Sequence, residues 1–182
     1  NSVMYKIMNV VIVGLGIIGG SMAKAIAKYT DNYIIGINRS REPLEKALAC
    51  GAINEIGTVD DLKRADLIIL GTYPEVAVKF VRDNAALIPK DCIVIDTSGI
   101  KSKICPQLVE ISKEYGFTFV GCHPMAGKEK NGFDVSDADL FNGASCIIIP
   151  CEAPKDAVEK IANLAKKLRF GSVCYSTPEE HD

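Results

Sequence analysis

Three short segments contain side chains whose types and spacing are suited to chemistry, and each follows an apolar run. The first is a glycine-rich turn over 14–19, GLGIIG, which fits the pattern GxGxxG. The second is DTSGIKSK over 96–103, and the third is GCHPMAGKEKNG over 121–132. Glycines let a backbone approach a phosphate, and histidine exchanges protons near neutral pH. These residue types predict dinucleotide binding combined with proton transfer.

The glycine turn stands in the context that a dinucleotide-binding fold requires, between a β-branched apolar run and a helical pattern. Its first glycine permits the tight turn, the second lets the backbone approach a pyrophosphate, and the third lets helix and strand pack closely. The helix N-terminus offers free N–H groups to the phosphates. The alternative is a turn that serves packing alone. We expect the whole turn to contact the cofactor, namely Gly14, Leu15, Gly16, Ile17, Ile18 and Gly19.

The end of the second expected strand indicates which cofactor binds. An acidic residue there would bind the ribose 2′-OH of NAD, whereas an arginine suits the 2′-phosphate of NADP. The chain has Asn38, Arg39 and Ser40 in this region and no carboxylate before Glu42. Arg39 can clamp a phosphate bidentately and Ser40 can donate a hydrogen bond to it. The pattern therefore predicts NADP rather than NAD, although a solvated loop arginine is the alternative.

Two further loops follow apolar runs and are expected at the same edge of the sheet. Thr72, Tyr73 and Pro74 are expected to form a wall of the cofactor site, and simple helix initiation at Pro74 is the alternative. In the next loop, Ser98 and Gly99 are expected beside the nicotinamide, where the hydroxyl can bond the carboxamide or a substrate hydroxyl. A turn-forming Ser-Gly pair explains the same residues.

For two side chains near these loops the sequence allows more than one role. Lys101 either orients a substrate carboxylate or caps its loop. His123 precedes Pro124 at an expected strand end, where oxidation of an alcohol needs a proton acceptor, and a structural histidine is the alternative. Cys122 would point to the opposite face of the strand, so a Cys-His nucleophile is not expected.

The elements that position these residues alternate between apolar runs and helical patterns. This alternation predicts a doubly wound, mostly parallel α/β sheet of the Rossmann type. We expect strands over 9–16, 33–38, 66–72, 91–97, 117–122, 144–151 and 171–176. Helices are expected over 17–29, 41–51, 58–65, 74–88, 103–115 and 154–169, with a polar stretch over 123–140.

Composition narrows the functional class. The chain has 182 residues and a formal net charge of −2, which provides no basic surface for nucleic acid. No apolar run approaches the length of a membrane span, so we expect no membrane partner. Seven irregularly spaced cysteines predict free thiols in a reducing compartment, the cytoplasm, and no metal site.

At 10–26, 96–103 and above all 121–132, the sequence resembles the prephenate/arogenate dehydrogenase family, in its N-terminal nucleotide-binding domain. The resemblance covers the chain after residue 8. It implies NAD(P)-dependent oxidative decarboxylation of prephenate to 4-hydroxyphenylpyruvate, or of arogenate to tyrosine, in tyrosine biosynthesis. His123 matches the histidine that accepts the substrate's hydroxyl proton. Family members place a catalytic serine in the loop, but Gly then Ser is the usual order, so Ser98 is displaced by one residue.

The resemblance also sets expectations about domains. Residues 1–176 are expected to form the nucleotide-binding domain, with 1–3 a remnant of expression, and 177–182 to begin a helical domain that binds substrate and forms a homodimer. The chain alone should bind cofactor and turn over its substrate poorly. Lys128 stands where some members have threonine, while Glu129 keeps the acidic residue, which bears on the choice between prephenate and arogenate.

Two other functions fit the glycine turn. One is a related NADP-dependent hydroxyacid or imine reductase, and the other is a non-catalytic module that senses nucleotide. A reductase of that kind would not need the HPMAG sequence at 123–127, and replacing His123 with alanine would distinguish an enzyme from a sensor. The sequence leaves open the choice between prephenate and arogenate, and any feedback by tyrosine.

Overall fold

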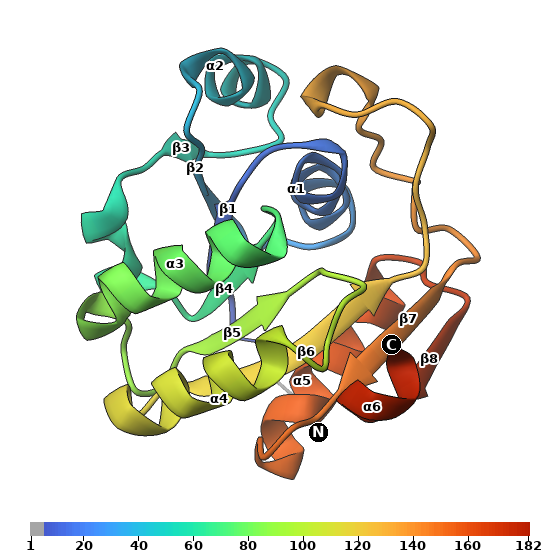
Figure 1. The fold of residues 1–182 in the computed structure, drawn as a ribbon. Helices are drawn as coiled ribbons and strands as arrows, with labels where there is room; N and C mark the ends of the chain where they lie inside the picture. The colour runs from blue at the N-terminus through green and yellow to red at the C-terminus, as the bar shows by residue number, and fades with distance from the viewer. Residues whose placement is uncertain (1–5) are drawn as a thin grey trace.

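A computed structural model describes residues 6–182, so the expected expression remnant at 1–3 lies outside the described residues. The described chain forms one eight-stranded sheet in the order β3-β2-β1-β4-β5-β6-β7-β8, with helices on both faces (Figure 1). The strands are β1 Asn9–Val13, β2 Tyr33–Ile37, β3 Glu55–Ile56, β4 Leu67–Leu70, β5 Ile93–Asp96, β6 Thr118–Pro124, β7 Ser145–Ile149 and β8 Ser172–Tyr175.

A helix or a 3₁₀ turn lies in each connection between successive strands. The α-helices are α1 Ile17–Tyr29, α2 Arg41–Ala49, α3 Pro74–Asn84, α4 Ile104–Tyr115, α5 Lys155–Lys167 and the short α6 Pro178–His181. Three 3₁₀ turns complete the set, η1 Val59–Arg64, η2 Ala85–Leu87 and η3 Phe133–Val135. Within the described residues, no helix is both long enough and apolar enough to cross a bilayer.

The strands from β3 to β6 are parallel, as the continuous apolar runs predicted. Both faces of these strands are buried because α1, α2 and α5 contribute to the hydrophobic core on one face, and α3 and α4 to that on the other. The doubly wound, mostly parallel fold is therefore confirmed. The strands from β3 to β6 all end at one edge, which is where the loops with candidate site residues gather.

The direction of the sheet changes at β6. This strand pairs with β5 in parallel up to Val120, and then from Gly121 onward it pairs with β7 antiparallel. The partner β7 extends β6 through Pro124, so His123 lies inside a strand and not after it. The prediction that the strand ends at 122 was wrong, because the extension depends on a partner more than twenty residues away.

Other local differences have physical reasons. The segment predicted as a helix over 58–65 is the 3₁₀ turn η1, which begins at Thr58 with a full capping box to Asp61. The turn has only six residues, and short runs of this length adopt the tighter 3₁₀ geometry. The two-residue strand β3 was not predicted; it is defined by its pairing with β2.

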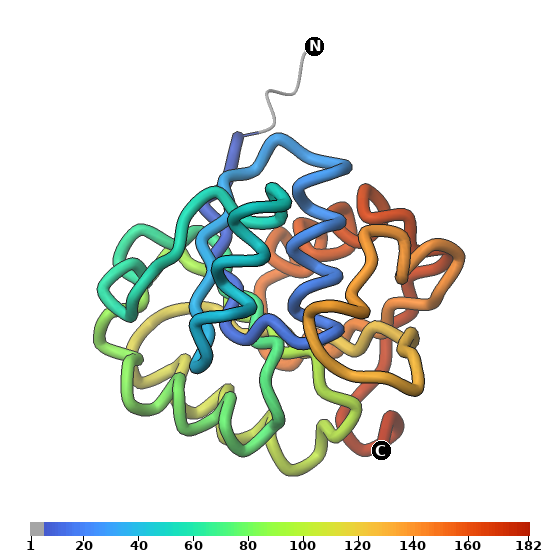
Figure 2. The backbone as a smooth tube through the Cα atoms, turned by 90° about the horizontal axis from the view of Figure 1, so that it is seen from above, coloured from blue at the N-terminus to red at the C-terminus, as the bar shows by residue number. Residues whose placement is uncertain are grey.

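The polar stretch after β6 runs across the outside of α1 (Figure 2). A Cβ at Gly20 would lie 2.8 Å from the Phe133 ring and 3.0 Å from Ser136, so η3 packs closely on the first turns of α1. The amine of Lys24 donates to the Ser136 carbonyl at 2.9 Å. This stretch therefore covers the flank of the helix that follows the glycine turn.

Candidate functional site

The glycine turn between β1 and α1 has the close packing that its spacing predicted. Gly14 has φ +94°, a conformation that side chains disfavour. A Cβ at Gly19 would lie 1.8 Å from the Gly14 carbonyl oxygen, and one at Gly71 would lie 2.7 Å from the same atom. The backbones of β1, β4 and α1 thus meet here without room for side chains.

Asn38 supports this turn from the end of β2. Its side-chain oxygen accepts the N–H of Leu15 at 2.8 Å, and its side-chain amide donates to the Ser40 carbonyl at 2.9 Å. The amide group therefore joins the two loops at which a dinucleotide's phosphates and ribose would lie. Asn38 belongs to the predicted site, but its side chain holds the protein's own backbone.

The start of α1 is open toward the edge of the sheet. Gly16 is the N-cap, no side chain caps the helix and the first turn has no acidic residue. A Cβ at Gly16 would meet nothing within 4 Å. Nearby, the buried hydroxyl oxygen of Thr72 has no hydrogen-bond partner among the described residues. Free N–H groups, open space and an orphaned hydroxyl are features that fit the phosphates of a dinucleotide.

The remaining predicted cofactor residues lie in loops around this opening. Tyr73 is the N-cap of α3 and is 78% exposed, while Pro74 begins that helix. Ser40 is the N-cap of α2 with no side-chain cap bond, and Arg39 before it is exposed. The side chains of Arg39 and Ser40 are therefore accessible to a ligand at the end of β2.

Gly99, more than Ser98, faces the imidazole of His123. A Cβ at Gly99 would lie 3.0 Å from Cε1 and 3.1 Å from Nε2 of that ring. The hydroxyl of Ser98 instead accepts the N–H of Ile100 at 3.1 Å, which forms a local turn. The structure thus places His123 and the 98–99 loop together, with the serine side chain directed at its own loop.

Lys101 does not face a substrate site, and its predicted role with a substrate carboxylate is wrong for this structure. Its side chain is fully buried, and Nζ donates to Asp96 Oδ2 at 2.5 Å and to the Cys122 carbonyl at 2.7 Å. Burial raises the pKa of Asp96, opposed by the Lys101 charge and by N–H donors. Through these two bonds the buried lysine holds its own loop against β5 and β6. This role is closer to the alternative prediction, that Lys101 caps its loop.

His123 contacts a residue that sequence reasoning did not select. Its Nδ1 lies 2.7 Å from Nε2 of His181, the last residue of α6. Burial, followed by His181 and the Lys101 ammonium, lowers the pKa of His123 to about 4. The imidazole is therefore neutral at physiological pH and can accept a proton. The signal in the sequence was that the chain has only two histidines.

Cys122 is not a nucleophile for this site. It is buried on the other face of β6, and its Sγ lies 3.4 Å from Sγ of Cys146. The Cys146 hydrogen bond and burial raise the pKa of the Cys122 thiol well above its usual value, which suppresses the thiolate. All seven cysteines are free thiols in the structure, four of them buried, while Cys50 and Cys174 are exposed.

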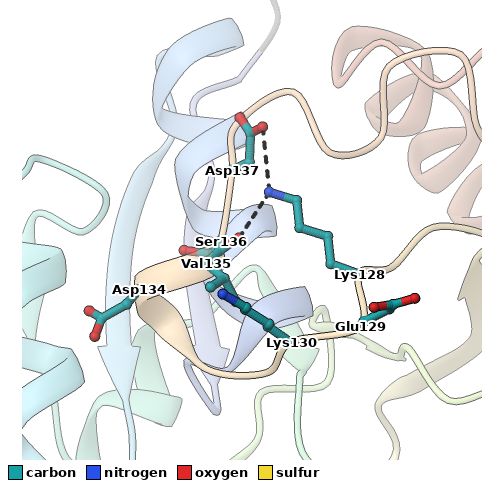
Figure 3. A pocket seen from close by; sticks show the side chains of 7 residues that line it. All are labelled: Lys128, Glu129, Lys130, Asp134, Val135, Ser136 and Asp137. Carbon is teal, nitrogen blue, oxygen red and sulfur yellow. Dashed lines mark hydrogen bonds and ion pairs between the residues drawn. The ribbon is translucent and has the colours of Figure 1, made fainter.

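A charged hollow of about 550 Å³ is lined by 128–130 and 134–137, in the loop that follows β6 (Figure 3). Lys128 reaches across it to the Val135 carbonyl at 3.2 Å and toward the Asp137 carboxylate at 4.0 Å. Acidic and basic groups alternate around the hollow, so it has no single charge preference. These contacts of Lys128 link the start of the loop over 128–137 to its end, and Glu129 is the next residue in the lining of the hollow.

Comparison with known proteins decides the family. The sequence matches the family described as prephenate dehydrogenase, nucleotide-binding domain, over residues 22–173. The chain belongs to this family. Prephenate dehydrogenase of Bacillus subtilis (strain 168) is 34% identical over 178 residues, which cover 95% of this chain and 47% of that protein.

Solved structures of the prephenate dehydrogenase family share the fold. Synechocystis arogenate dehydrogenase aligns with a TM-score of 0.89 at 26% identity, covering 96% of this chain and 61% of that one. Prephenate dehydrogenase from A. aeolicus, in complex with hydroxyphenyl propionate and NAD+, aligns with a TM-score of 0.86 at 26% identity. The alignment covers 98% of this chain and 63% of that one. The chain thus spans about half to under two thirds of these relatives.

Proposed function

We propose that this chain is the cofactor-binding domain of a prephenate or arogenate dehydrogenase. The observation that carries the proposal is the position of His123 against Gly99, at the edge of the sheet that also presents the open N-terminus of α1. In open α/β sheets, ligands bind outside the carboxyl ends of the strands. A hydride acceptor and a proton acceptor would therefore meet at one edge.

Several groups support binding of a nicotinamide dinucleotide. The free N–H groups at the start of α1 and the unobstructed Gly16 would hold the pyrophosphate. The partnerless Thr72 hydroxyl and the exposed Tyr73 would line the cofactor, and Ser98 and Gly99 would lie at the nicotinamide end. A bound nicotinamide supplies the site with a hydride acceptor.

NADP is the proposed cofactor and NAD the less favoured one. The end of β2 presents the exposed Arg39 and the uncapped Ser40, and its first carboxylate is Glu42 in α2. An arginine and a hydroxyl suit a 2′-phosphate, whereas a carboxylate would repel it. The NAD+ in the A. aeolicus structure is bound to that protein and does not decide the cofactor of this chain. Competitive titration of this chain with both cofactors tests the preference.

The reaction needs a base at one stated atom. Nε2 of His123 would accept the proton of the substrate hydroxyl while the hydride leaves the carbon that bears it. The electron pair of the bond to the departing carboxylate then completes the aromatic ring, and carbon dioxide leaves. His123 is neutral at physiological pH, as this role requires. Ser98 would contact the same hydroxyl only if its side chain turns away from Ile100.

The proposed active site also includes groups from outside this chain. The relatives extend well beyond the aligned region, and we propose that a helical domain beginning near 177–182 supplies the substrate's carboxylate ligands and a homodimer interface. The seven free cysteines favour a reducing compartment, the cytoplasm. The chain alone should then bind cofactor and oxidise its substrate poorly.

The deciding experiment separates an enzyme from a nucleotide sensor or another reductase. The natural gene product is assayed with prephenate and with arogenate, alongside His123→Asn and direct titration of cofactor. We expect turnover of one substrate, a loss of about a hundredfold or more in the variant, and unchanged cofactor affinity. Cofactor binding without turnover of either substrate would contradict the proposal.

A further inference from the structure

The short helix α6 is fastened to the loop that carries Ser98 and Gly99. The Asp182 carboxylate accepts the N–H of Lys101 at 2.6 Å and the N–H of Ser102 at 3.0 Å, and it also bonds the Ser102 hydroxyl. These contacts bring the C-terminal turn against the loop over 97–103 (Figure 2). The Ser102 hydroxyl and the two N–H groups lower the pKa of Asp182, so it remains charged.

The helix itself is locally defined. Thr177 caps it by accepting the N–H of Glu180 at 3.2 Å, and Pro178 occupies its first position. His181 follows one turn later and directly precedes Asp182. Since the cap fixes one end and the Asp182 carboxylate fixes the other, the direction of the His181 side chain is restricted.

In this direction the His181 ring contacts the ring of His123. The two rings lie edge to face, with centroids 4.9 Å apart and planes at 76°, and the contact joins Nδ1 of His123 to Nε2 of His181 at 2.7 Å. One of these two nitrogens must carry the hydrogen. The other nitrogen of His123, Nε2, lies on the side of Gly99.

We propose that His181 is a positioning residue, which accepts a hydrogen bond from Nδ1–H of His123 and so leaves Nε2 of His123 unprotonated toward the reacting hydroxyl. The direction of the bond rests on the proposed function, because a base at Nε2 requires the proton on Nδ1. The same bond fixes the orientation of the ring, so that Nε2 keeps its place toward the reacting hydroxyl. Asp182 holds His181 in place and also ties it to the 98–99 loop.

The charged groups around His123 and His181 are consistent with a His123 ring that is neutral and held in one orientation. From the loop after β5, the charge of the buried Lys101 ammonium acts on His123, and this ammonium is itself paired with Asp96. His181 of α6 contacts the His123 ring, and the Asp182 carboxylate that follows it bonds the N–H of Lys101. The lysine opposes protonation of His123 before substrate binds, whereas His181 offers an acceptor to the Nδ1 proton.

The test reads the tautomer directly. Since the chain contains only two histidines, untagged protein with ¹⁵N-labelled histidine gives two imidazole spin systems. We expect His123 to carry its proton on Nδ1 with Nε2 unprotonated at neutral pH. In His181→Gln the amide oxygen can replace the acceptor and preserve this tautomer. In His181→Leu the acceptor is lost, and a population with the proton on Nε2 should appear.

A control variant and a kinetic readout separate positioning from folding. Glu179→Gln changes an exposed residue of the same helix and should leave the His123 signals unchanged. In the natural gene product, His181→Leu should lower kcat by about tenfold to a hundredfold, within what a positioned base contributes. KM should change little, the pH profile should shift, and His181→Gln should recover much of the rate.

Two outcomes would overturn the inference. One is a proton on Nε2 of His123 in the wild-type protein, and the other is a His123 tautomer that is the same in His181→Leu. Both are measured on the isolated chain without substrate, so they remain decisive if the gene product proves to have another activity. A thermal melt of each variant identifies an unfolded protein, in which case Asp182→Asn gives the equivalent test by releasing α6.

Discussion

Lys101 and Asp96 form a buried ion pair behind the strand that carries His123. The lysine donates to the Cys122 carbonyl at 2.7 Å, and the other oxygen of Asp96 accepts the Cys122 N–H at 3.2 Å. Strand β5 ends at Asp96, so these two side chains bond the backbone of β6 where β5 no longer pairs with it. The pair thereby sets the position of the residue next to His123.

Replacing Lys101 should therefore destabilise the whole domain. Lys101→Met leaves Asp96 buried without its charge partner, and breaking such a pair costs about 3–5 kcal/mol of the free energy of unfolding. Urea unfolding measures the loss. Lys103→Met is the matched control, because Lys103 is exposed and its nearest carboxylate is 4.0 Å away. An equal loss in both variants would show that the buried pair has no special weight.

Two glycines of the same turn should respond differently to alanine. A Cβ at Gly19 would overlap the Gly14 carbonyl, so Gly19→Ala should lose stability as well as dinucleotide binding, by about 1–3 kcal/mol for overpacking. Gly16 has φ −79° and free space, so Gly16→Ala should fold normally. Its methyl group would still obstruct an approaching pyrophosphate. Calorimetric titration combined with thermal melts distinguishes the two, and normal binding by Gly16→Ala would contradict the placement of the phosphates.

Arg39 should decide between the two cofactors. Arg39→Ala removes a charged donor from the 2′-phosphate, so affinity for NADP should fall about tenfold to a hundredfold, the equivalent of 1.5–3 kcal/mol. Affinity for NAD should be nearly unchanged. Arg41→Ala serves as control, since that side chain is paired with Glu45 at 3.2 Å. Tighter binding of NAD than NADP by the wild-type chain would reject the preference.

Crowding His123 should impair its role without unfolding the domain. A methyl group at Gly99 would lie 3.0 Å from Cε1 of the ring, so Gly99→Ala must push the imidazole aside. The shift needed is a few tenths of an ångström, so turnover by the natural gene product should fall by less than the roughly hundredfold that a misplacement of about 1 Å costs. Gly127→Ala, with nothing within 4 Å, is the control. If both variants keep full activity, His123 is not oriented by this loop.

The depressed pKa of His123 predicts how stability depends on pH. In the unfolded chain a histidine titrates near pH 6.5, whereas in the folded domain His123 titrates at about 4. Between these values the unfolded state binds more protons, so the free energy of unfolding falls as pH falls from 6.5 toward 4. Urea midpoints across this range should fall more steeply for the wild type than for His123→Asn. Parallel curves would contradict the low folded pKa.

Much of the fold and part of the site could be predicted from local sequence. The order of apolar runs and helical patterns predicts the parallel sheet, because each run reports its own burial. The glycine turn predicts its own geometry, since Gly14 and Gly19 meet within six residues. The start of α6 is local in the same way, because Thr177 caps the helix and Pro178 occupies its first position.

The contacts that define the site were decided by the tertiary structure. His123 and His181 are 58 residues apart, and Lys101 is 21 residues from the carbonyl that it bonds. A lysine in a polar loop does not by itself reveal that it is buried, because its carboxylate partner and the backbone groups it bonds come together only on folding. The sequence by itself determined which residues can bind a dinucleotide or move a proton. Only the packed structure determined which of them touch, because hydrogen-bond partners distant in the chain leave no periodic signal in it.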